Sequence, residues 1–257
     1  MKVIAAVLCL SCLVLWSALP AVAQETSRNV RVAAEVPLSA LMSLTERYLT
    51  GTLQALQVAA CSTEVQSGDW QQMRSVLACT NAGGAEAVIW FANLDGSYAT
   101  LDKGPTGLSL SDRAYFPKLV RGEQVLGDLV ISKSTGRNTA IVAVPVKREG
   151  KVIGGVGASI YLDSLSERLT KDMALPEDMI FFALDPSGKV TTLNATTQRI
   201  FLDPAAVGSP SLAQAVTLML QRDRGTVAYD FAGARRLGVY ATSPVLKWHF
   251  LLAVVTR

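Results

Sequence analysis

The chain has 257 residues, half of them hydrophobic and 18% charged, and its formal net charge is +3. This composition predicts a well-packed globular protein and argues against intrinsic disorder. The basic residues are scattered singly and the net charge is small, so the sequence does not indicate a nucleic-acid-binding protein.

An export signal is predicted at the N-terminus. Lys2 provides a positive start, residues 3–19 form an apolar core, and residues 21–23 (Ala-Val-Ala) are typical of a cleavage site. The alternative is an uncleaved membrane anchor, for which the apolar stretch is barely long enough. We expect cleavage before Gln24, which would give a periplasmic or secreted protein with no further membrane span.

Two helices are predicted after this leader. The first begins near Pro37, a residue suited to a first helical turn, and runs to about Ala60 with an apolar stripe at three- and four-residue steps. The second covers residues 69–77. Cys61 and Cys79 lie just beyond the two helices, and an even pair of cysteines in an oxidising compartment favours a disulfide. Two reduced, buried cysteines are the alternative.

Two similar β-hairpins follow along the chain. Residues 87–94 and 97–101 read as strands joined by an Asp-Gly turn, and residues 179–184 and 189–193 repeat the pattern around Asp-Pro-Ser-Gly. Because the two hairpins are about 90 residues apart, they indicate an internal repeat.

The repeat continues beyond the hairpins. A helix at 111–120 corresponds to one at 211–221, and the strand beginning at Val125 corresponds to residues 225–231. Pro145, inside a predicted strand, corresponds to Pro244. The final strands, 152–160 and 248–255, also match, and a helix at 162–173 connects the two copies. The predicted fold class is therefore α+β, with a long N-terminal helix followed by two modules, each a helix over an antiparallel sheet.

Five short motifs lie in order between residues 111 and 162. They are DRAYF at 112–116, ISK at 131–133, TGR at 135–137, VPV at 144–146 and GGVGASI at 154–160. Together they resemble the extracytoplasmic Cache sensor domain family, and the repeat resembles its double-Cache arrangement of two PAS-like modules. The division that follows is a signal peptide at 1–23, an N-terminal helical segment at 24–84, a membrane-distal-type module at 85–174 and a second module at 175–257.

The DRAYF segment carries the candidate ligand site. The planar fork of Arg113 suits a carboxylate, and Tyr115 adds an aromatic wall and a hydroxyl. Ser132 and Lys133 are expected on the strand beneath. The resemblance implies that the arginine and the aromatic residue line the ligand pocket of the first module. The alternative is structural, with Arg113 in an ion pair and Tyr115 anchoring the helix to the sheet.

Three further expectations concern this region. Ser111 or Asp112 is predicted to cap the helix. The glycines of residues 154–157 are expected to pack closely against that helix rather than cradle a phosphate. The matching helix of the second module has no arginine at its start, so we expect a pocket in the first module only.

The resemblance also bears on the ligand. Family members that sense amino acids usually have an aspartate where this chain has Ser159, and that aspartate holds the ammonium group of the ligand. Ser159 has no charge, which disfavours an α-amino acid. The expected ligand is a small organic acid that lacks an ammonium group.

Catalytic chemistry is not indicated. His249 is the single histidine and no G-x-S-x-G motif is present. Cys9 and Cys12 fall in the predicted signal, and Cys61 and Cys79 are too far apart for a zinc site, so we expect no enzyme, no metal and no cofactor. The predicted function is a periplasmic or secreted ligand-binding sensor in signal transduction related to chemotaxis. We expect it to lack a signalling domain of its own and to act with a membrane receptor or sensor kinase. The alternative is a ligand-free structural or interaction module of the same fold.

Overall fold

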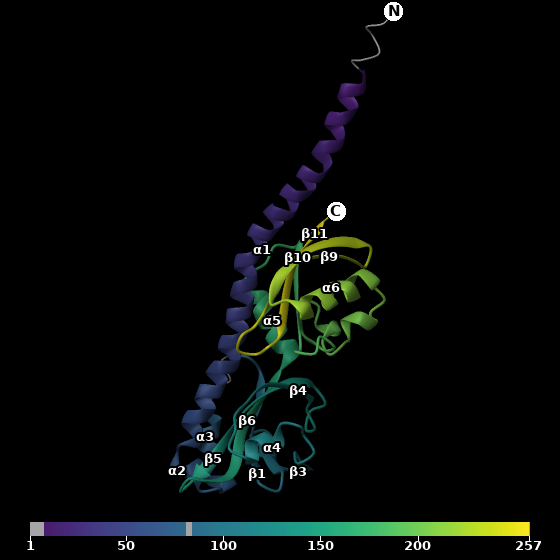
Figure 1. Cartoon of the computed structure of the whole chain (residues 1–257). Helices are drawn as coiled ribbons and strands as arrows, with labels where there is room; N and C mark the ends of the chain where they lie inside the picture. Colours follow the sequence, from purple (N-terminus) through teal and green to yellow (C-terminus); the bar gives the residue numbers. More distant parts are fainter. Residues whose placement is uncertain (1–7, 81–83, 257) are drawn as a thin grey trace, which may run out of the picture.

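The computed structural model describes residues 8–80 and 84–256, in which one long helix lies alongside two β-sheets (Figure 1). This helix, α1, spans Leu8–Ala60 and therefore begins well before Pro37, where the apolar stripe predicted its start. The predicted signal cleavage before Gln24 falls within α1 and stays a prediction. Within the described residues, no helix is both long and apolar enough to cross a membrane.

Two short helices follow α1. They are α2 (Thr63–Gln66) and α3 (Trp70–Ala78), and α3 confirms the helix predicted at 69–77. Cys61 and Cys79 are both free and exposed, so the predicted disulfide between them is wrong. The physical reason is that α3 buries Met73 and Leu77, which leaves Cys79 on the exposed C-terminal end of that helix.

The first sheet has six strands in the order β3-β2-β1-β6-β5-β4. The strands are β1 (Ala87–Asn93), β2 (Ser97–Thr100), β3 (Gly104–Ser109), β4 (Val125–Ile131), β5 (Asn138–Arg148) and β6 (Lys151–Tyr161). All the pairings are antiparallel, as the hairpin patterns predicted. The sequence pattern missed β3, whose six residues include two glycines and a proline.

The second sheet has five strands in the order β8-β7-β11-β10-β9. The strands are β7 (Met179–Leu184), β8 (Thr191–Asn194), β9 (Arg224–Phe231), β10 (Ala234–Thr242) and β11 (His249–Thr256). The helix α5 (Leu162–Met173) connects the modules, and α6 (Pro210–Gln221) lies in the second. Apart from the edge strand β3, which has no counterpart, the strands of the two sheets follow the same order, and this confirms the predicted repeat. Pro244 departs from it, because it lies in the turn after β10 and not within a strand.

Each sheet has an inner face and an outer face. The inner faces of both sheets pack on α1 in one continuous core, to which Leu49, Val144 and Phe250 belong. The outer faces form two separate clusters. In the first module the cluster includes Leu119 of the short helix α4 (Phe116–Val120), and in the second it includes Leu212 of α6.

One turn of α1 holds both the second module and the connecting helix. The Ser243 hydroxyl donates a hydrogen bond of 2.6 Å to a carboxylate oxygen of Glu46. Two residues further on, the Tyr48 hydroxyl donates one of 2.5 Å to a carboxylate oxygen of Asp172, in α5. The position of α1 is therefore tied to both parts of the chain by directional bonds as well as by apolar packing.

Candidate functional site

The five predicted site residues come together around one cavity on the outer face of the first sheet. They are Arg113, Tyr115, Ser132, Lys133 and Ser159, which line it with Trp90, Tyr98 and Ile141 among others. The cavity volume is about 10 Å³, roughly the space of one water molecule. The residues chosen from the sequence motifs are therefore neighbours in the structure, and the cavity between them is very small.

The segment that carries Arg113 is not helical, contrary to the prediction. The helix α4 begins at Phe116, its N-cap residue is Tyr115 without a side-chain hydrogen bond, and Pro117 occupies its first turn. Neither Ser111 nor Asp112 therefore caps it, contrary to the prediction. Proline is favoured in a first turn, which explains the later start. Arg113 therefore precedes α4 and does not project from its first turn.

Glycines of β6 let two large side chains approach the sheet closely. A Cβ atom added at Gly157 would lie 2.2 Å from the ring of Trp90, and one added at Gly155 would lie 2.4 Å from Leu119 of α4. Any larger side chain would displace these groups. Close packing at the glycines is confirmed, but only Gly155 packs against the helix as predicted, whereas Gly157 packs against Trp90 of β1. The contact with Trp90 leaves little free space on this face.

Arg113 is held by the backbone and makes no ion pair with any residue in the described ranges. Its Nη2 donates a hydrogen bond of 2.7 Å to the carbonyl oxygen of Ile131, at the end of β4. Its Nε is buried and has no hydrogen-bond partner there. A buried donor without a partner costs about 1–3 kcal/mol, so the Arg113 guanidinium, which belongs to the cavity lining, retains an unmet demand for an acceptor.

The aromatic wall is built by Tyr115 and Trp90. Tyr115 is almost fully buried, its ring centroid is 6.4 Å from that of Trp90, and burial raises the pKa of its phenol. The indole Nε1 of Trp90 donates a hydrogen bond of 3.1 Å to Ser159 Oγ. Ser159 is thus engaged by the wall itself, at the position where an aspartate was noted to be absent.

Lys133 closes the rim of the cavity. Its Nζ donates hydrogen bonds of 2.6 Å to Asp112 Oδ1 and 2.7 Å to the carbonyl oxygen of Ser109. The bond from Lys133 holds the pKa of the Asp112 carboxyl below its usual value. The charge of Lys133 is therefore already paired, and Arg113 supplies the only unpaired charge among the residues that line this cavity. Ser132 and Lys133 lie in the turn after β4 and not on the strand, contrary to the prediction, because β4 ends at Ile131. The Ser132 hydroxyl lies 3.3 Å from the Ser134 hydroxyl.

The second module contains a larger cavity that the sequence analysis missed. Its volume is about 180 Å³ and its lining includes Arg199 and Arg236. The expectation of a pocket in the first module only is therefore wrong. It rested on the helix at 210–221, whereas these arginines come from a loop helix and from β10. The alternation of Tyr229 and Phe231 on β9 was the available signal, because it places both side chains on one face.

The chain is similar to proteins of known family and structure. A family model described as Cache domain matches residues 17–256, and no curated protein matches the sequence. Among solved structures, an extracellular ligand binding receptor from Desulfohalobium retbaense has a TM-score of 0.67 at 13% identity, covering 85% of this chain and 39% of that one. The chain thus spans well under half of that receptor.

Two chemoreceptor ligand-binding domains are also similar. That of Pseudomonas fluorescens CtaA, in complex with L-isoleucine, has a TM-score of 0.65 at 16% identity, covering 92% of this chain and 95% of that one. That of Campylobacter jejuni Tlp3, in complex with 4-methylisoleucine, has a TM-score of 0.64 at 14% identity, with 90% and 91% covered. These identities support the fold alone. The family model spans nearly the whole chain and both sheets share one strand order, so this chain belongs to the Cache family of ligand-binding sensor domains, in its two-module form.

Proposed function

We propose that the first-module cavity binds a small carboxylate and that the chain senses this ligand outside the cytoplasm. One observation carries the proposal: Arg113 lines a cavity whose lining contains no carboxylate, and its buried Nε has no hydrogen-bond partner in the described structure. A carboxylate accepts two parallel hydrogen bonds from a guanidinium fork. The ligand would therefore satisfy the donor that the protein leaves unpaired.

The charge balance favours an anion over a zwitterion. Lys133 is neutralised by Asp112, and Arg113 leaves one positive charge on the cavity. An α-amino acid also needs a partner for its ammonium group, and Ser159, at the position where amino-acid sensors of the family usually have an aspartate, is uncharged and already accepts a hydrogen bond from Trp90. Burying an ammonium group without an acceptor of opposite charge is costly.

Binding requires the cavity to open. A volume of about 10 Å³ holds no carboxylate, so the segment around Arg113 must move away from the sheet. The Lys133–Asp112 ion pair joins that segment to the turn after β4, and Asp112 is largely exposed to solvent. Exposed ion pairs contribute little stability, so this closure can break at low cost. The small size of the space favours a ligand of a few carbon atoms.

The position of α1 supports a role in signalling. It packs on the inner faces of both sheets and is bonded to Ser243 and Asp172 through Glu46 and Tyr48. A ligand-dependent shift in the first module would change the contacts of this helix. We propose that the change passes to a membrane receptor or sensor kinase.

A thermal-melting screen with calorimetry tests the ligand. Acetate, pyruvate and malate would be compared with L-alanine and L-isoleucine. A ligand at a hundredfold excess over its Kd stabilises the folded state by about 2.7 kcal/mol, which raises Tm by several degrees. We expect the carboxylates to produce this rise and the amino acids to produce less.

Variants assign the effect to the cavity. Arg113→Ala should abolish the rise, and Ser159→Asp should weaken carboxylate binding by placing a second anion beside the ligand. Arg121→Ala is the matched control, because Arg121 lies just past α4 and pairs with Glu123 outside the cavity. Stronger stabilisation by amino acids, or intact carboxylate binding in Arg113→Ala, would show that the proposal is wrong. No response to any compound would favour the ligand-free structural module.

A further inference from the structure

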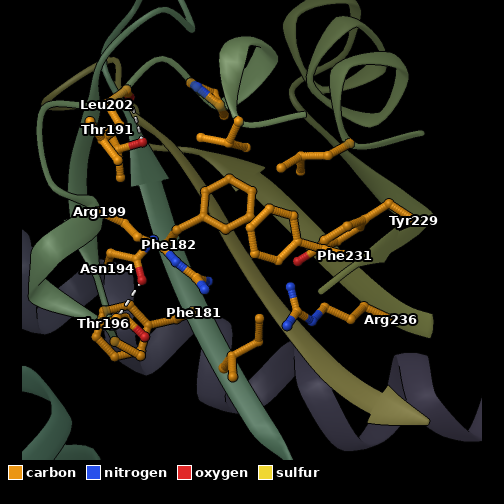
Figure 2. A pocket seen from close by; sticks show the side chains of 15 residues that line it. Phe181, Phe182, Thr191, Asn194, Thr196, Arg199, Leu202, Tyr229, Phe231 and Arg236 are labelled. Carbon is orange, nitrogen blue, oxygen red and sulfur yellow. Dashed lines mark hydrogen bonds between the residues drawn. The ribbon is translucent and has the colours of Figure 1, made fainter. Parts of the chain in front are cut away.

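The second module has a cavity of its own on the outer face of its sheet, with a volume of about 180 Å³. Its walls come from β7, β8, α6, β9 and β10 and from the 3₁₀ helix η1 (Thr197–Arg199) (Figure 2). An engineered apolar cavity of about 150 Å³ is large enough to bind benzene. The cavity therefore has room for a six-membered ring without the opening that the first module requires.

The lining combines an apolar body with two cations. Phe182, Tyr229, Phe231 and Leu212 contribute apolar surface, and Arg199 and Arg236 contribute guanidinium groups. Figure 2 shows the two arginine side chains reaching toward each other from opposite sides of the cavity. Their guanidinium carbons lie 4.6 and 4.9 Å from the centroid of the Phe231 ring. Both cations are thus positioned beside one aromatic side chain.

Neither cation is neutralised by the protein. No aspartate or glutamate lines the cavity, and neither arginine forms an ion pair with a residue in the described ranges. The nearby Asp230 is paired with Arg235 instead. Two like charges that share a partly buried site repel each other and lose hydration. An anion in the cavity would relieve both costs.

Nε of Arg236 and the hydroxyl of Tyr229 are buried and form no hydrogen bond of good geometry in the described structure. The hydroxyl nevertheless lies close enough to the Arg236 side chain for that side chain to lower its pKa. The two residues face each other in register on β10 and β9, so both groups lie at one place. Burial raises the pKa of Tyr229 to about 12, although the Arg236 charge opposes the shift. The phenol is therefore a neutral hydrogen-bond donor at physiological pH. A donor pair of this kind fits the oxygen atoms of a carboxylate.

We propose that this cavity is a second ligand site, which takes a carboxylate with a ring-sized apolar body. The carboxylate lies between Arg199 and Arg236, and the ring packs against Phe182 and Phe231. The site does not depend on the Arg113 cavity and would stand if the proposed function of that cavity failed. It gives the chain two sites for acids of different size, one in each module.

The test uses the full chain, with benzoate and benzamide as a matched pair of probes. Benzamide keeps the ring and the planar shape but has no charge. We expect benzoate to bind in isothermal titration calorimetry and benzamide to bind at least tenfold more weakly, because a hydrogen bond to a charged group contributes about 1.5–3 kcal/mol. Equal binding of the two probes, or no benzoate binding at millimolar concentration, would overturn the proposal.

Variants locate the benzoate site. Arg236→Gln and Arg199→Gln should each weaken binding about tenfold or more. Arg235→Gln is the control, because Arg235 is adjacent on β10, points to the other face and pairs with Asp230. Arg113→Ala should leave benzoate binding unchanged, which separates this site from the first cavity.

Circular dichroism of each variant checks that it folds. If Arg236→Gln does not fold, the loss of benzoate binding in Arg199→Gln, on the loop helix, tests the site. Equal losses in Arg235→Gln, or loss of benzoate binding in Arg113→Ala, would contradict the assignment.

Discussion

The two modules share one strand order but differ in what they place on the outer face of the sheet. In the first, Trp90 lies directly on Gly157, and the cavity has a volume of about 10 Å³ with one unpaired arginine. In the second, the cavity has about 180 Å³ and two unpaired arginines. The fold therefore fixes where a cavity lies, and a few side chains decide whether it is open and how it is charged.

The difference also separates two modes of binding. The first cavity must open to admit a ligand, and the free-energy cost of this opening reduces the observed affinity. The second cavity is already large enough for its proposed ligand, so less of the binding free energy is lost on opening it. We therefore expect the first module to change shape more on binding, and the second to respond mainly through charge.

The largest effect is expected from breaking the close packing of the first module. Gly157→Val would place side-chain atoms within the ring of Trp90, because even a Cβ atom would lie 2.2 Å from it. Overpacking of this kind costs about 3 kcal/mol, and the Tm measured by circular dichroism should fall by many degrees. Gly51→Ala on α1, where an added Cβ meets nothing within 4 Å, is the control and should stabilise by about 0.5–1 kcal/mol. A Gly157→Val protein as stable as the wild type would show that the cavity is not closed by this contact.

A smaller effect is expected from the hydroxyl of Tyr229 in the second module. Tyr229→Phe removes a buried group without a partner and should raise the free energy of unfolding by about 1 kcal/mol at neutral pH. Tyr240→Phe is the control, since its hydroxyl donates to the carbonyl oxygen of Leu218 and its loss should not stabilise. Benzoate binding should weaken in Tyr229→Phe alone.

The same tyrosine predicts a loss of stability in alkali. Its pKa is about 12 in the folded state against an ordinary value of 10.0. Its titration therefore leaves the free energy of unfolding unchanged well below pH 10.0 and lowers it as the pH rises from 10.0 toward 12. Chemical denaturation between pH 9 and 11.5 should show a steeper decline for the wild type than for Tyr229→Phe. Identical slopes would contradict the burial of this phenol.

The smallest effect is expected from the ion pair at the rim of the first cavity. The hydrogen bond from Lys133 lowers the pKa of Asp112 below its ordinary 3.8, so the contribution is present above that value and is lost as the pH falls through the lower, folded-state pKa. Asp112→Asn and Lys133→Met should both remove this acid-dependent step in Tm. Both variants should bind carboxylates faster in stopped-flow measurements, because the rim is no longer held closed. Unchanged association rates would show that the pair does not control entry.

The sequence predicted most of the fold because hydrophobic alternation and turn residues are local signals. The two hairpins, the repeat, α5 and the role of the β6 glycines all follow from such patterns. It also gathered the five residues of the first cavity, since their motifs come from one continuous stretch. The helix start at Phe116 could have been read from Pro117, but the short polar residues before it gave a competing cap signal.

The second cavity was beyond a motif search. Arg199 comes from the 3₁₀ helix η1 in a loop, and Arg236 comes from β10, whose bounds the sequence pattern did not predict. They meet only because β9 and β10 pair in a register that sets Arg236 opposite Tyr229. The disulfide failed for a related reason, since spacing along the chain does not reveal which face of α3 is buried.

Strand β6 separates the first cavity from α1 by a single layer of backbone. Gly157 lies against the Trp90 ring and Ser159 lines the cavity, whereas Val156 and Ala158 are fully buried in the core that includes α1. Alternate residues of one strand therefore contact the ligand side and the helix side. Closely packed interiors have low compressibility and transmit strain, so a displacement of Trp90 against the outer face should also move the backbone of β6. We expect even a small ligand, without contacting α1, to press on it through the thickness of this strand.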